Sequence, residues 1–423
     1  MTDMDISHRR LEQLEASFGN SFYLLDLQQL EENFNRFSAA FRAAYNNTRI
    51  AYSYKANYLP VICAALDRMG AYAEVVSGME YDLACRVGVA TDKIIFNGPC
   101  KTPRDIERAL IEGARLNIDS SIEIDAVLAA AAQYPGRQFN LGLRCNFGLS
   151  DCPLSRFGFD VEGREIRDVF KRVDDAGNCR IGGLHCHFIT RDRSPAVYSE
   201  MAAKILAVVE KFFKTDPPDS INLGGGFFSN MPEALKCQFE VPIPSFEDYA
   251  AAIGPHFAAR FCGRHQPQLI LEPGLALVAD CMRFAAKVVD IKTIRGRAIA
   301  LLSGSVYNVI PTKSERKLPI TVISSIDQGP RRVVDGPFDL VGYTCMEDDV
   351  LAEDHRGSLA VGDYVLFNNV GAYTLVLKPS FIAPCPPVLA VSSGSGRLTV
   401  VKRAEDFEDI FATHVFQDHA ATL

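Results

Sequence analysis

The chain has 423 residues, of which 48% are hydrophobic and 23% charged, and its formal net charge is −8. This composition is typical of a soluble globular protein with one or two domains, and the negative charge disfavours a nucleic-acid-binding surface. The acidic start at residues 1–5 is not typical of a signal peptide, and no apolar stretch is long enough to span a bilayer. Twelve cysteines without a Cys-x-x-Cys pair predict reduced thiols, a cytoplasmic location and no metal site.

Between residues 20 and 280, short apolar runs alternate with amphipathic helical stretches. Capping residues mark two of the helices: Thr102 and Gly113 flank one, and Ser245 with Asp248 opens another. The alternation predicts parallel strands covered by helices, either an open doubly wound sheet or a closed (β/α)8 barrel, and eight or nine units favour the barrel. The expected strands are 22–27, 50–55, 73–77, 94–98, 116–120, 139–146, 181–188, 221–227 and 269–273.

After residue 283 the pattern changes to apolar runs with few helices between them. We therefore expect an antiparallel β domain in this half, with a turn at Ser392–Gly396. Its expected strands are 284–294, 298–302, 320–323, 364–368 and 398–403.

Lys55 ends the apolar run 50–55, and it is the most informative residue of the chain. Burying its ammonium without a partner would cost on the order of several kcal/mol, so the group is expected to lose its proton or to become covalently bonded. A neutral lysine attacks carbonyl groups and forms Schiff bases. The alternative is a lysine whose stem packs on the strand while its head group lies in solvent.

Three other strand ends carry polar or glycine residues. Gly224–Gly226 could let the backbone approach a phosphate, although a simple turn would look the same. Glu272 could face a ring nitrogen or form a structural ion pair, and His187 could be a ligand-facing or a core histidine. These strand ends and Lys55 together offer an amine, a phosphate-binding backbone segment, a carboxylate and an imidazole. Pyridoxal phosphate requires this set of groups.

A set of short motifs runs in order along nearly the whole chain. These motifs are Tyr54–Asn57, Glu74–Ser77, Phe96–Gly98, Ser155–Gly158, Gly183–His187, Gly224–Gly226, Glu272, Cys345 and Gly371–Thr374. With them the chain resembles the fold-type III pyridoxal-phosphate-dependent decarboxylases. This group has an alanine-racemase-like barrel and includes diaminopimelate, ornithine and arginine decarboxylases.

The resemblance implies a carboxy-lyase that uses pyridoxal 5′-phosphate. Lys55 would hold the cofactor as a Schiff base, and His187 would stack on its ring. Glu272 would keep the pyridine nitrogen protonated, so that the ring accepts the electrons released as CO₂ leaves. Cys345 or Lys55 would then return a proton to Cα. Further cofactor contacts are implied for Thr190, Gly224, Gly225, Gly226, Gly274 and Tyr373.

The family architecture implies three segments and a dimer. Residues 1–28 would join the β domain, residues 29–283 would form the cofactor-binding barrel, and residues 284–423 would form the C-terminal β domain. The active form would be a homodimer with shared sites, in which Cys345 reaches the partner's active site.

The chain departs from the family pattern at positions that bind the substrate in the family. Leu275 replaces the arginine of Glu-Pro-Gly-Arg, Met346 replaces the acid after the cysteine, and Ile310 replaces the arginine of Arg-Pro. Leucine and isoleucine cannot rebuild a bidentate grip on a carboxylate, which disfavours diaminopimelate as the substrate. The candidate substrate residues are Arg144, Leu275, Met346, Glu347 and Arg316.

These departures favour decarboxylation of a modified or conjugated amino acid in a siderophore or natural-product pathway, such as a citryl-linked one. Basic residues near the expected rim could receive such an acidic substrate; they are Arg191, Arg193, Lys313, Arg316 and Lys317. The alternative is a primary-metabolism decarboxylase for diaminopimelate, lysine, ornithine or arginine, with Glu347 or Asp348 as the missing acid. A second alternative is an amino-acid racemase or epimerase, against which Glu272 argues. A non-catalytic cofactor-handling protein and a catalytically inactive interaction protein are further alternatives.

Overall fold

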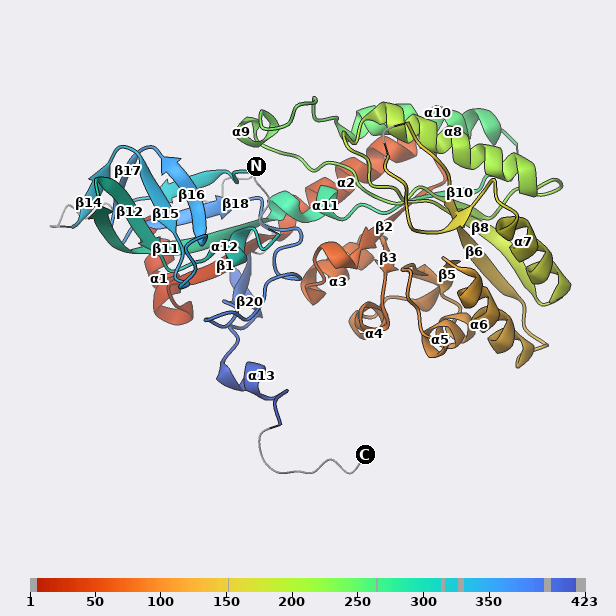
Figure 1. Ribbon diagram of the computed structural model, residues 1–423, viewed down its shortest axis with the longest axis horizontal. Helices are drawn as coiled ribbons and strands as arrows, with labels where there is room; N and C mark the ends of the chain where they lie inside the picture. Colours follow the sequence, from red (N-terminus) through yellow and green to blue (C-terminus); the bar gives the residue numbers. More distant parts are fainter. Residues whose placement is uncertain are drawn as a thin grey trace. The chain divides into compact units, whose positions relative to one another are not determined.

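The computed structural model describes residues 6–150, 152–263, 265–312, 316–325, 331–391 and 397–415. The expected turn at Ser392–Gly396 and the basic residue Lys313 lie outside these ranges. The chain divides into two compact units; Figure 1 labels their helices and strands and colours them in sequence order. The barrel unit comprises Leu30–Asn230 and Phe239–Val278, and the β unit comprises Met1–Gln29, Met231–Gln238 and Ala279–Leu423.

In the described part of the barrel unit, eight parallel strands form a closed ring. Each pairs with the next in chain order, and β10 pairs with β2 to close the ring, which confirms the expected (β/α)8 barrel. A short strand, β7 (Phe159–Asp160), extends β6. The ring strands are β2 (Thr48–Ser53), β3 (Tyr72–Val75), β4 (Ile94–Phe96), β5 (Arg115–Ile118), β6 (Phe139–Asn146), β8 (Cys179–His185), β9 (Ser220–Asn222) and β10 (Gln268–Leu271).

Helices follow the strands and cover the barrel, and their ends use the expected capping residues. Thr102 and Asp105 form a capping box at the start of α5, which ends at Gly113 in the left-handed region, and Ser245 with Asp248 caps α10 in the same way. In Figure 1, α8 and α10 lie side by side. The covering helices are α2 (Leu27–Ala44), α3 (Pro60–Arg68), α4 (Gly78–Val87), α5 (Pro103–Glu112), α6 (Ser121–Ala132), α7 (Glu165–Asp175), α8 (Pro195–Phe212) and α10 (Phe246–Arg260), with the short α11 (Leu275–Val278) and the 3-10 turns η1 (Tyr54–Ala56) and η2 (Thr91–Lys93).

The β unit is built on a mostly antiparallel sheet, as expected. Its main path runs β16-β15-β12-β11-β1-β19-β20, and β18 pairs with β11 and β13. The pairs β1–β19 and β12–β15 are parallel. Its strands are β1 (Ser21–Asp26), β11 (Met282–Ile294), β12 (Arg297–Leu302), β13 (Ile320–Ile323), β15 (Phe338–Val341), β16 (Val350–His355), β18 (Tyr364–Asn368), β19 (Val388–Val391) and β20 (Leu398–Lys402), with β14 (Val333–Asp335) paired to β17 (Ser358–Ala360) beside them. Its helical segments are α1 (His8–Phe18), α9 (Glu233–Lys236), η3 (Ala279–Cys281), α12 (Val306–Val309) and α13 (Phe407–Phe411).

An aromatic cluster fills the space between the barrel and its outer helices. The Phe227 ring stacks on Tyr198 with centroids 4.8 Å apart and meets Phe37 and Tyr249 edge-on. Such pairs stabilise the barrel beyond the apolar area they bury. This packing fixes the glycine segment that precedes Phe227 against α8.

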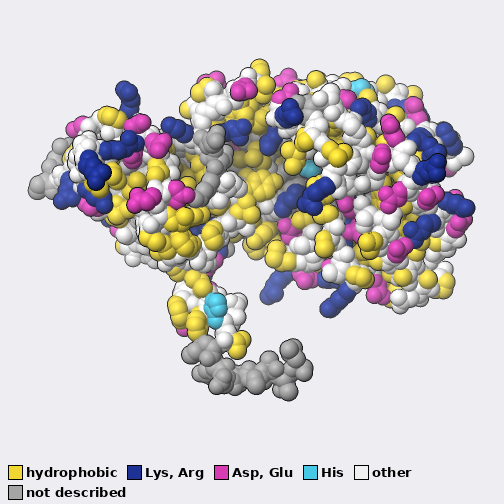
Figure 2. Space-filling model, in the orientation of Figure 1, with side chains coloured by type: hydrophobic (Ala, Val, Ile, Leu, Met, Phe, Trp, Pro, Cys, Tyr) yellow, Lys and Arg dark blue, Asp and Glu magenta, His cyan; other side chains and the backbone are white. Residues whose placement is uncertain are grey.

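On the face shown in Figure 2, basic and acidic side chains are interspersed over the barrel unit rather than gathered by sign. This arrangement does not resemble the basic stripe of a nucleic-acid-binding surface. All twelve cysteines are free thiols. Within the described ranges, every helix is too short or too polar to cross a membrane.

Candidate active site

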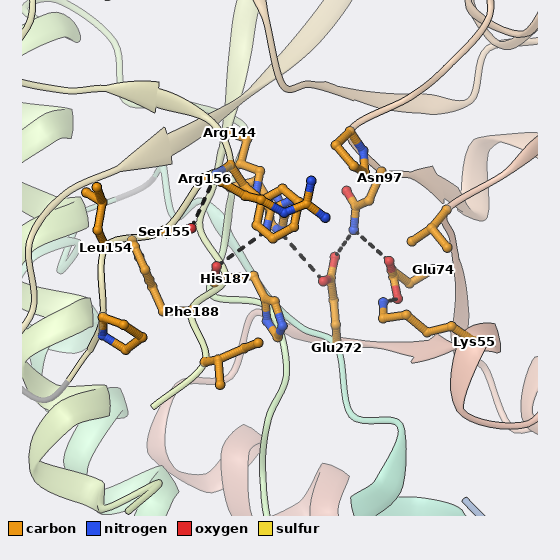
Figure 3. Close-up of a pocket in the computed structure, with 17 residues that line it drawn as sticks. Lys55, Glu74, Asn97, Arg144, Leu154, Ser155, Arg156, His187, Phe188 and Glu272 are labelled. Carbon is orange, nitrogen blue, oxygen red and sulfur yellow. Dashed lines mark hydrogen bonds and ion pairs between the residues drawn. The ribbon is translucent and has the colours of Figure 1, made fainter. Parts of the chain in front are cut away.

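A cavity of about 460 Å³ opens at the carboxyl ends of the barrel strands (Figure 3). This is the end at which barrel enzymes place their chemistry, and the volume lies within the usual range for small-molecule sites. The cavity collects side chains from six strand ends that are far apart in the sequence: Lys55, Glu74, Asn97, Arg144, His187 and Glu272.

Lys55 lies in η1, directly after β2, and its ammonium forms an ion pair with the Glu74 carboxylate on β3. The Lys55 side chain is 35% exposed, whereas that of Glu74 is only 1% exposed. The Lys55 ammonium is therefore neither fully buried nor unpaired, because the chain supplies a buried carboxylate as its partner. The amine nevertheless lines the cavity and is held by a group that can accept its proton.

Asn97 connects the two buried carboxylates of the cavity. Its Nδ2 donates to Glu74 Oε1 at 3.0 Å and to Glu272 Oε1 at 2.7 Å. Asn117 Nδ2 donates to the Asn97 Oδ1 at 2.7 Å and so fixes the orientation of the amide. Lys55, Glu74, Asn97 and Glu272 thus form one continuous polar chain (Figure 3).

Glu272 follows β10 and is 3% exposed. Burial alone would raise its pKa, but the neighbouring His185 and the Lys55 charge outweigh burial and hold the pKa well below its usual range. Asn222 Nδ2 donates a second hydrogen bond to Glu272 Oε1 at 2.6 Å. Glu272 is therefore a carboxylate at neutral pH.

His187 and His185 differ in their surroundings although both come from the end of β8. Removal from bulk water, followed by the Lys55 charge, lowers the pKa of His187 to about 3, so its ring is neutral. Its Nδ1 accepts from the Gly225 amide at 3.0 Å. His185 is buried with its Nε2 3.5 Å from Glu272 Oε2, and within the described chain neither of its ring nitrogens has a hydrogen-bond partner.

The glycine segment after β9 packs directly against this histidine. Gly224 adopts a φ of 69°, and a Cβ there would lie 2.5 Å from His187 Nδ1, so no other residue fits. The amides of Gly224 and Gly225 already donate to Asn222 Oδ1 and His187 Nδ1, whereas the described residues offer no acceptor for the Gly226 amide. The Thr190 hydroxyl is likewise buried without a described partner.

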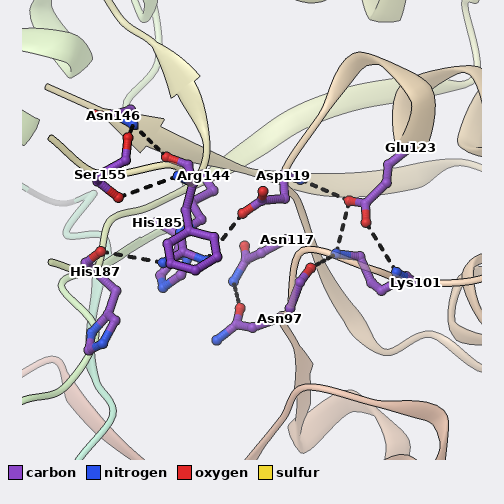
Figure 4. A network of polar contacts seen from close by, with 12 residues as sticks. Asn97, Lys101, Asn117, Asp119, Glu123, Arg144, Asn146, Ser155, His185 and His187 are labelled. Carbon is purple, nitrogen blue, oxygen red and sulfur yellow. Dashed lines mark hydrogen bonds and ion pairs between the residues drawn. The ribbon is translucent and has the colours of Figure 1, made fainter. Parts of the chain in front are cut away.

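Arg144 on β6 is 8% exposed and belongs to an extended polar network (Figure 4). Its guanidinium donates to Asp119 at 3.1 Å and to the His187 carbonyl at 3.3 Å. The Asp119 amide donates to Glu123, whose carboxylate pairs with the buried Lys101 at 2.9 Å. Arg144 therefore positions the His187 backbone and has its own acidic partner.

The remaining expected site residues fall into two groups. Gly274 and Leu275 belong to the barrel unit, where a Cβ on Gly274 would lie 2.8 Å from Ala56 Cβ, next to Lys55. The others belong to the β unit, and they are Cys345, Met346, Glu347, Arg316 and Tyr373. Cys345 and Met346 are exposed there, and the Met346 sulfur accepts from Tyr307 Oη at 3.3 Å.

Sequence reasoning assigned no role to Glu74, Asn97 or Arg156, which line the cavity. A signal for the first two was present, because each is a polar residue at the end of an apolar strand, as Lys55 is. Arg156 lies within the motif Ser155–Gly158 that contributed to the family resemblance, but its place in a loop without regular structure gave no indication that it lines the cavity.

Comparisons with known proteins agree with this geometry. Residues 27–279 match the family described as "Pyridoxal-dependent decarboxylase, pyridoxal binding domain". The diaminopimelate decarboxylase of Methanocaldococcus jannaschii is 27% identical over 424 residues, covering 96% of this chain and 94% of that protein. That of Actinosynnema pretiosum subsp. auranticum is 28% identical, covering 95% and 90% respectively.

Solved structures give the same picture. A crystal structure of diaminopimelate decarboxylase from M. jannaschii has a TM-score of 0.83 at 26% identity and covers 97% of this chain and 95% of that one. A lysine/ornithine decarboxylase from Vibrio vulnificus, complexed with putrescine, has a TM-score of 0.73 at 22% identity and covers 91% and 98%. At that identity the second likeness shows the fold alone.

Proposed function

Because this chain belongs to the family of pyridoxal-dependent decarboxylases, we propose that it releases the α-carboxylate of an amino acid as CO₂ in the barrel cavity. The observation that carries the proposal is the chain Lys55–Glu74–Asn97–Glu272, which places an amine and a permanently ionised carboxylate in one cavity. In a racemase we would expect a cation, and not the Glu272 carboxylate, to face the ring nitrogen of the cofactor.

Pyridoxal 5′-phosphate is the family's cofactor, and the residues present fit it. Lys55 supplies an amine for its aldehyde, and Glu272 supplies a carboxylate that would hold a proton on its ring nitrogen. The Gly226 amide and the Thr190 hydroxyl are donors suited to a phosphate oxygen. The Thr190 hydroxyl is buried without a partner among the described residues, and no hydrogen bond from the Gly226 amide is found among them. The neutral His187 ring offers a flat face in the same cavity.

When bound, pyridoxal phosphate supplies a ring that accepts the electron pair left at Cα as CO₂ departs. The protein's contribution is electrostatic and geometric. Glu272 is ionised because the neighbouring His185 and the Lys55 charge outweigh its burial, and Asn97 and Asn222 donate to its Oε1. It therefore favours a positive ring. Glu74 holds the Lys55 ammonium in the cavity and is the base within reach of its proton when the amine has to react.

A proton must finally reach Cα. Lys55 is one candidate donor because it lines the cavity and its ammonium is held there by Glu74. Cys345 is the other, through a homodimer whose partner subunit completes each site. This dimer and the phosphate contact of Tyr373 stay predictions from the family resemblance, and a cytoplasmic location stays a prediction from the cysteine pattern.

For the substrate, the comparisons support the primary-metabolism alternative better than our leading sequence hypothesis. The relatives reported above are named diaminopimelate decarboxylases, and the similarity extends over nearly the full length of each. We therefore place diaminopimelate first among the substrates to test.

A conjugated amino acid is the second candidate, because three positions specifically favour it. Leu275, Met346 and Ile310 replace the charged residues with which the family would bind a free diamino acid. Met346 is 37% exposed and uncharged, so it cannot replace an acid that binds a distal amine.

The test is CO₂ release by the purified holoenzyme from diaminopimelate, lysine, ornithine, arginine and citryl-diaminopropionate, with chiral analysis of each amino acid. Lys55→Ala should abolish release and the visible absorbance of the bound cofactor, while the exposed Lys171→Ala on α7 should change neither. Inversion without CO₂ would contradict the proposal and favour a racemase.

A further inference from the structure

Arg156 stands out among the cations of the cavity because it has no acidic partner in the described chain. Lys55 pairs with Glu74, and Arg144 pairs with Asp119. Arg156 lines the same cavity (Figure 3), and its guanidinium lies over an aromatic ring. Its charge is therefore available to a ligand.

The contact with Phe157 orients this arginine. The guanidinium carbon of Arg156 lies 4.3 Å from the centre of the Phe157 ring, and that of Arg144 lies 4.5 Å from the same centre. A cation–π contact of this kind engages the charge of the guanidinium and uses none of its N–H donors as hydrogen bonds. A planar fork of donors of this kind matches a carboxylate.

The wall around Arg156 is apolar. Leu154 is 97% exposed and Ile189 is 76% exposed, and both line the cavity together with Phe188. A ligand that reached Arg156 would lay an aliphatic stem along these side chains. The inner part of the cavity, where Lys55 lies, is by contrast strongly polar.

We propose that Arg156 binds a second carboxylate of the substrate, so that the enzyme selects amino acids with a carboxylate beyond the one that is lost. This inference rests on the proposed function and narrows it. Diaminopimelate and citryl conjugates carry such a group, whereas lysine, ornithine and arginine do not. Arg156 thereby replaces the grip that Leu275 and Ile310 cannot provide.

The experiment uses substrate pairs that differ in this carboxylate. Diaminopimelate is compared with lysine, which lacks only the distal carboxylate, and citryl-diaminopropionate with N-acetyl-diaminopropionate. KM and kcat are measured for wild type, Arg156→Gln and Arg156→Lys. Arg167→Gln, at an exposed arginine of α7, is the matched control.

In Arg156→Gln, KM for the preferred carboxylate-bearing substrate should rise by about tenfold or more while kcat changes by less than about threefold. Arg156→Lys should give an intermediate KM, because an ammonium keeps the charge without the fork. The KM of the partner lacking the carboxylate should change by less than about threefold. Titrating the cofactor absorbance with substrate should give the same ratios without relying on turnover.

Equal losses on both members of a pair, or no loss on either, would overturn the role of Arg156 and leave the decarboxylase proposal intact. The role of Arg156 would also be overturned if the wild-type enzyme preferred lysine to diaminopimelate and N-acetyl-diaminopropionate to citryl-diaminopropionate. If wild type releases CO₂ from no substrate, the proposed function itself fails and the inference fails with it.

Discussion

Asn97 Nδ2 lies 2.7 Å from Glu272 Oε1, and through this bond a carboxylate that follows the last barrel strand is tied to the end of β4. The same amide reaches Glu74, the partner of Lys55. Asn97 therefore positions the two acids on which the proposed chemistry depends.

Replacing Asn97 by leucine should lower kcat by roughly tenfold to a hundredfold, because two charge-assisted hydrogen bonds disappear. The pKa of Glu272, now held low, should rise when this donor is lost, so the acid limb of the pH profile should move to higher pH. The absorbance of the bound cofactor against pH should show the same shift. Asn140→Leu is the control, because Asn140 lies near the amino end of β6, away from the carboxyl ends at which the cavity opens. A loss of kcat at every pH with an unshifted pH profile would contradict a positioning role of Asn97.

Lys101 and Glu123 form a buried ion pair whose side chains are 0% and 6% exposed. Lys101→Met should destabilise the protein by about 3 kcal/mol, because a buried carboxylate loses its cation. Adding Glu123→Gln should restore part of the loss, since it removes the charge and keeps an acceptor for the Asp119 amide. Denaturant unfolding measures both effects.

The exposed pair Arg172–Asp125 gives the control for this cycle. Arg172→Met should cost less than about 1 kcal/mol. If Lys101→Met costs no more than Arg172→Met, the buried pair does not stabilise the barrel in the way its burial indicates.

His187 should make stability depend on pH in the cofactor-free protein. Its folded-state pKa of about 3 lies below the ordinary value of 6.5, so between these values the unfolded chain binds more protons. Stability should fall as the pH decreases from 6.5, by up to about 1.4 kcal/mol per pH unit from this residue. In His187→Phe this part of the slope should vanish, whereas His414→Phe, at an exposed position, should retain it. Equal slopes in both variants would argue against a neutral His187.

Mixing two inactive variants tests the shared-site dimer. Lys55→Ala and Cys345→Ala change different units of the chain. If each site takes Lys55 from one subunit and Cys345 from the other, random mixed dimers should recover roughly a quarter of wild-type activity. Recovery that stays at the level of the unmixed variants would exclude complementation between subunits.

The barrel and much of the site could be predicted from the sequence because their signals are local. Alternating strands and helices, the capping boxes at Thr102 and Ser245, and Lys55 after an apolar run can all be recognised in short windows. In the β unit, strands β14, β15, β16, β17 and β19 were missed. They have three to six residues each, and β15 and β19 are held by parallel pairing with strands distant in the sequence, which leaves no local mark.

The linkage between Glu74, Asn97 and Glu272 could not be predicted, since it depends on the closed ring. Each residue alone reads as a polar strand end, and their contacts arise because β3, β4 and β10 end at the same rim. The contact of the Arg156 guanidinium with the Phe157 ring could not be predicted either, because it depends on the conformation of a loop.

The pairing of β10 with β2 has a consequence for synthesis of the protein. Thr48 lies opposite Leu269, so the ring closes only after more than half of the chain has been made. Contacts of such long sequence separation form late in folding. A nascent chain that ends before Glu272 already contains Lys55, Glu74 and Asn97, yet it lacks the acid that completes the cavity. Ribosome-bound fragments should therefore acquire the ability to retain the cofactor abruptly, once β10 has emerged, rather than in proportion to their length.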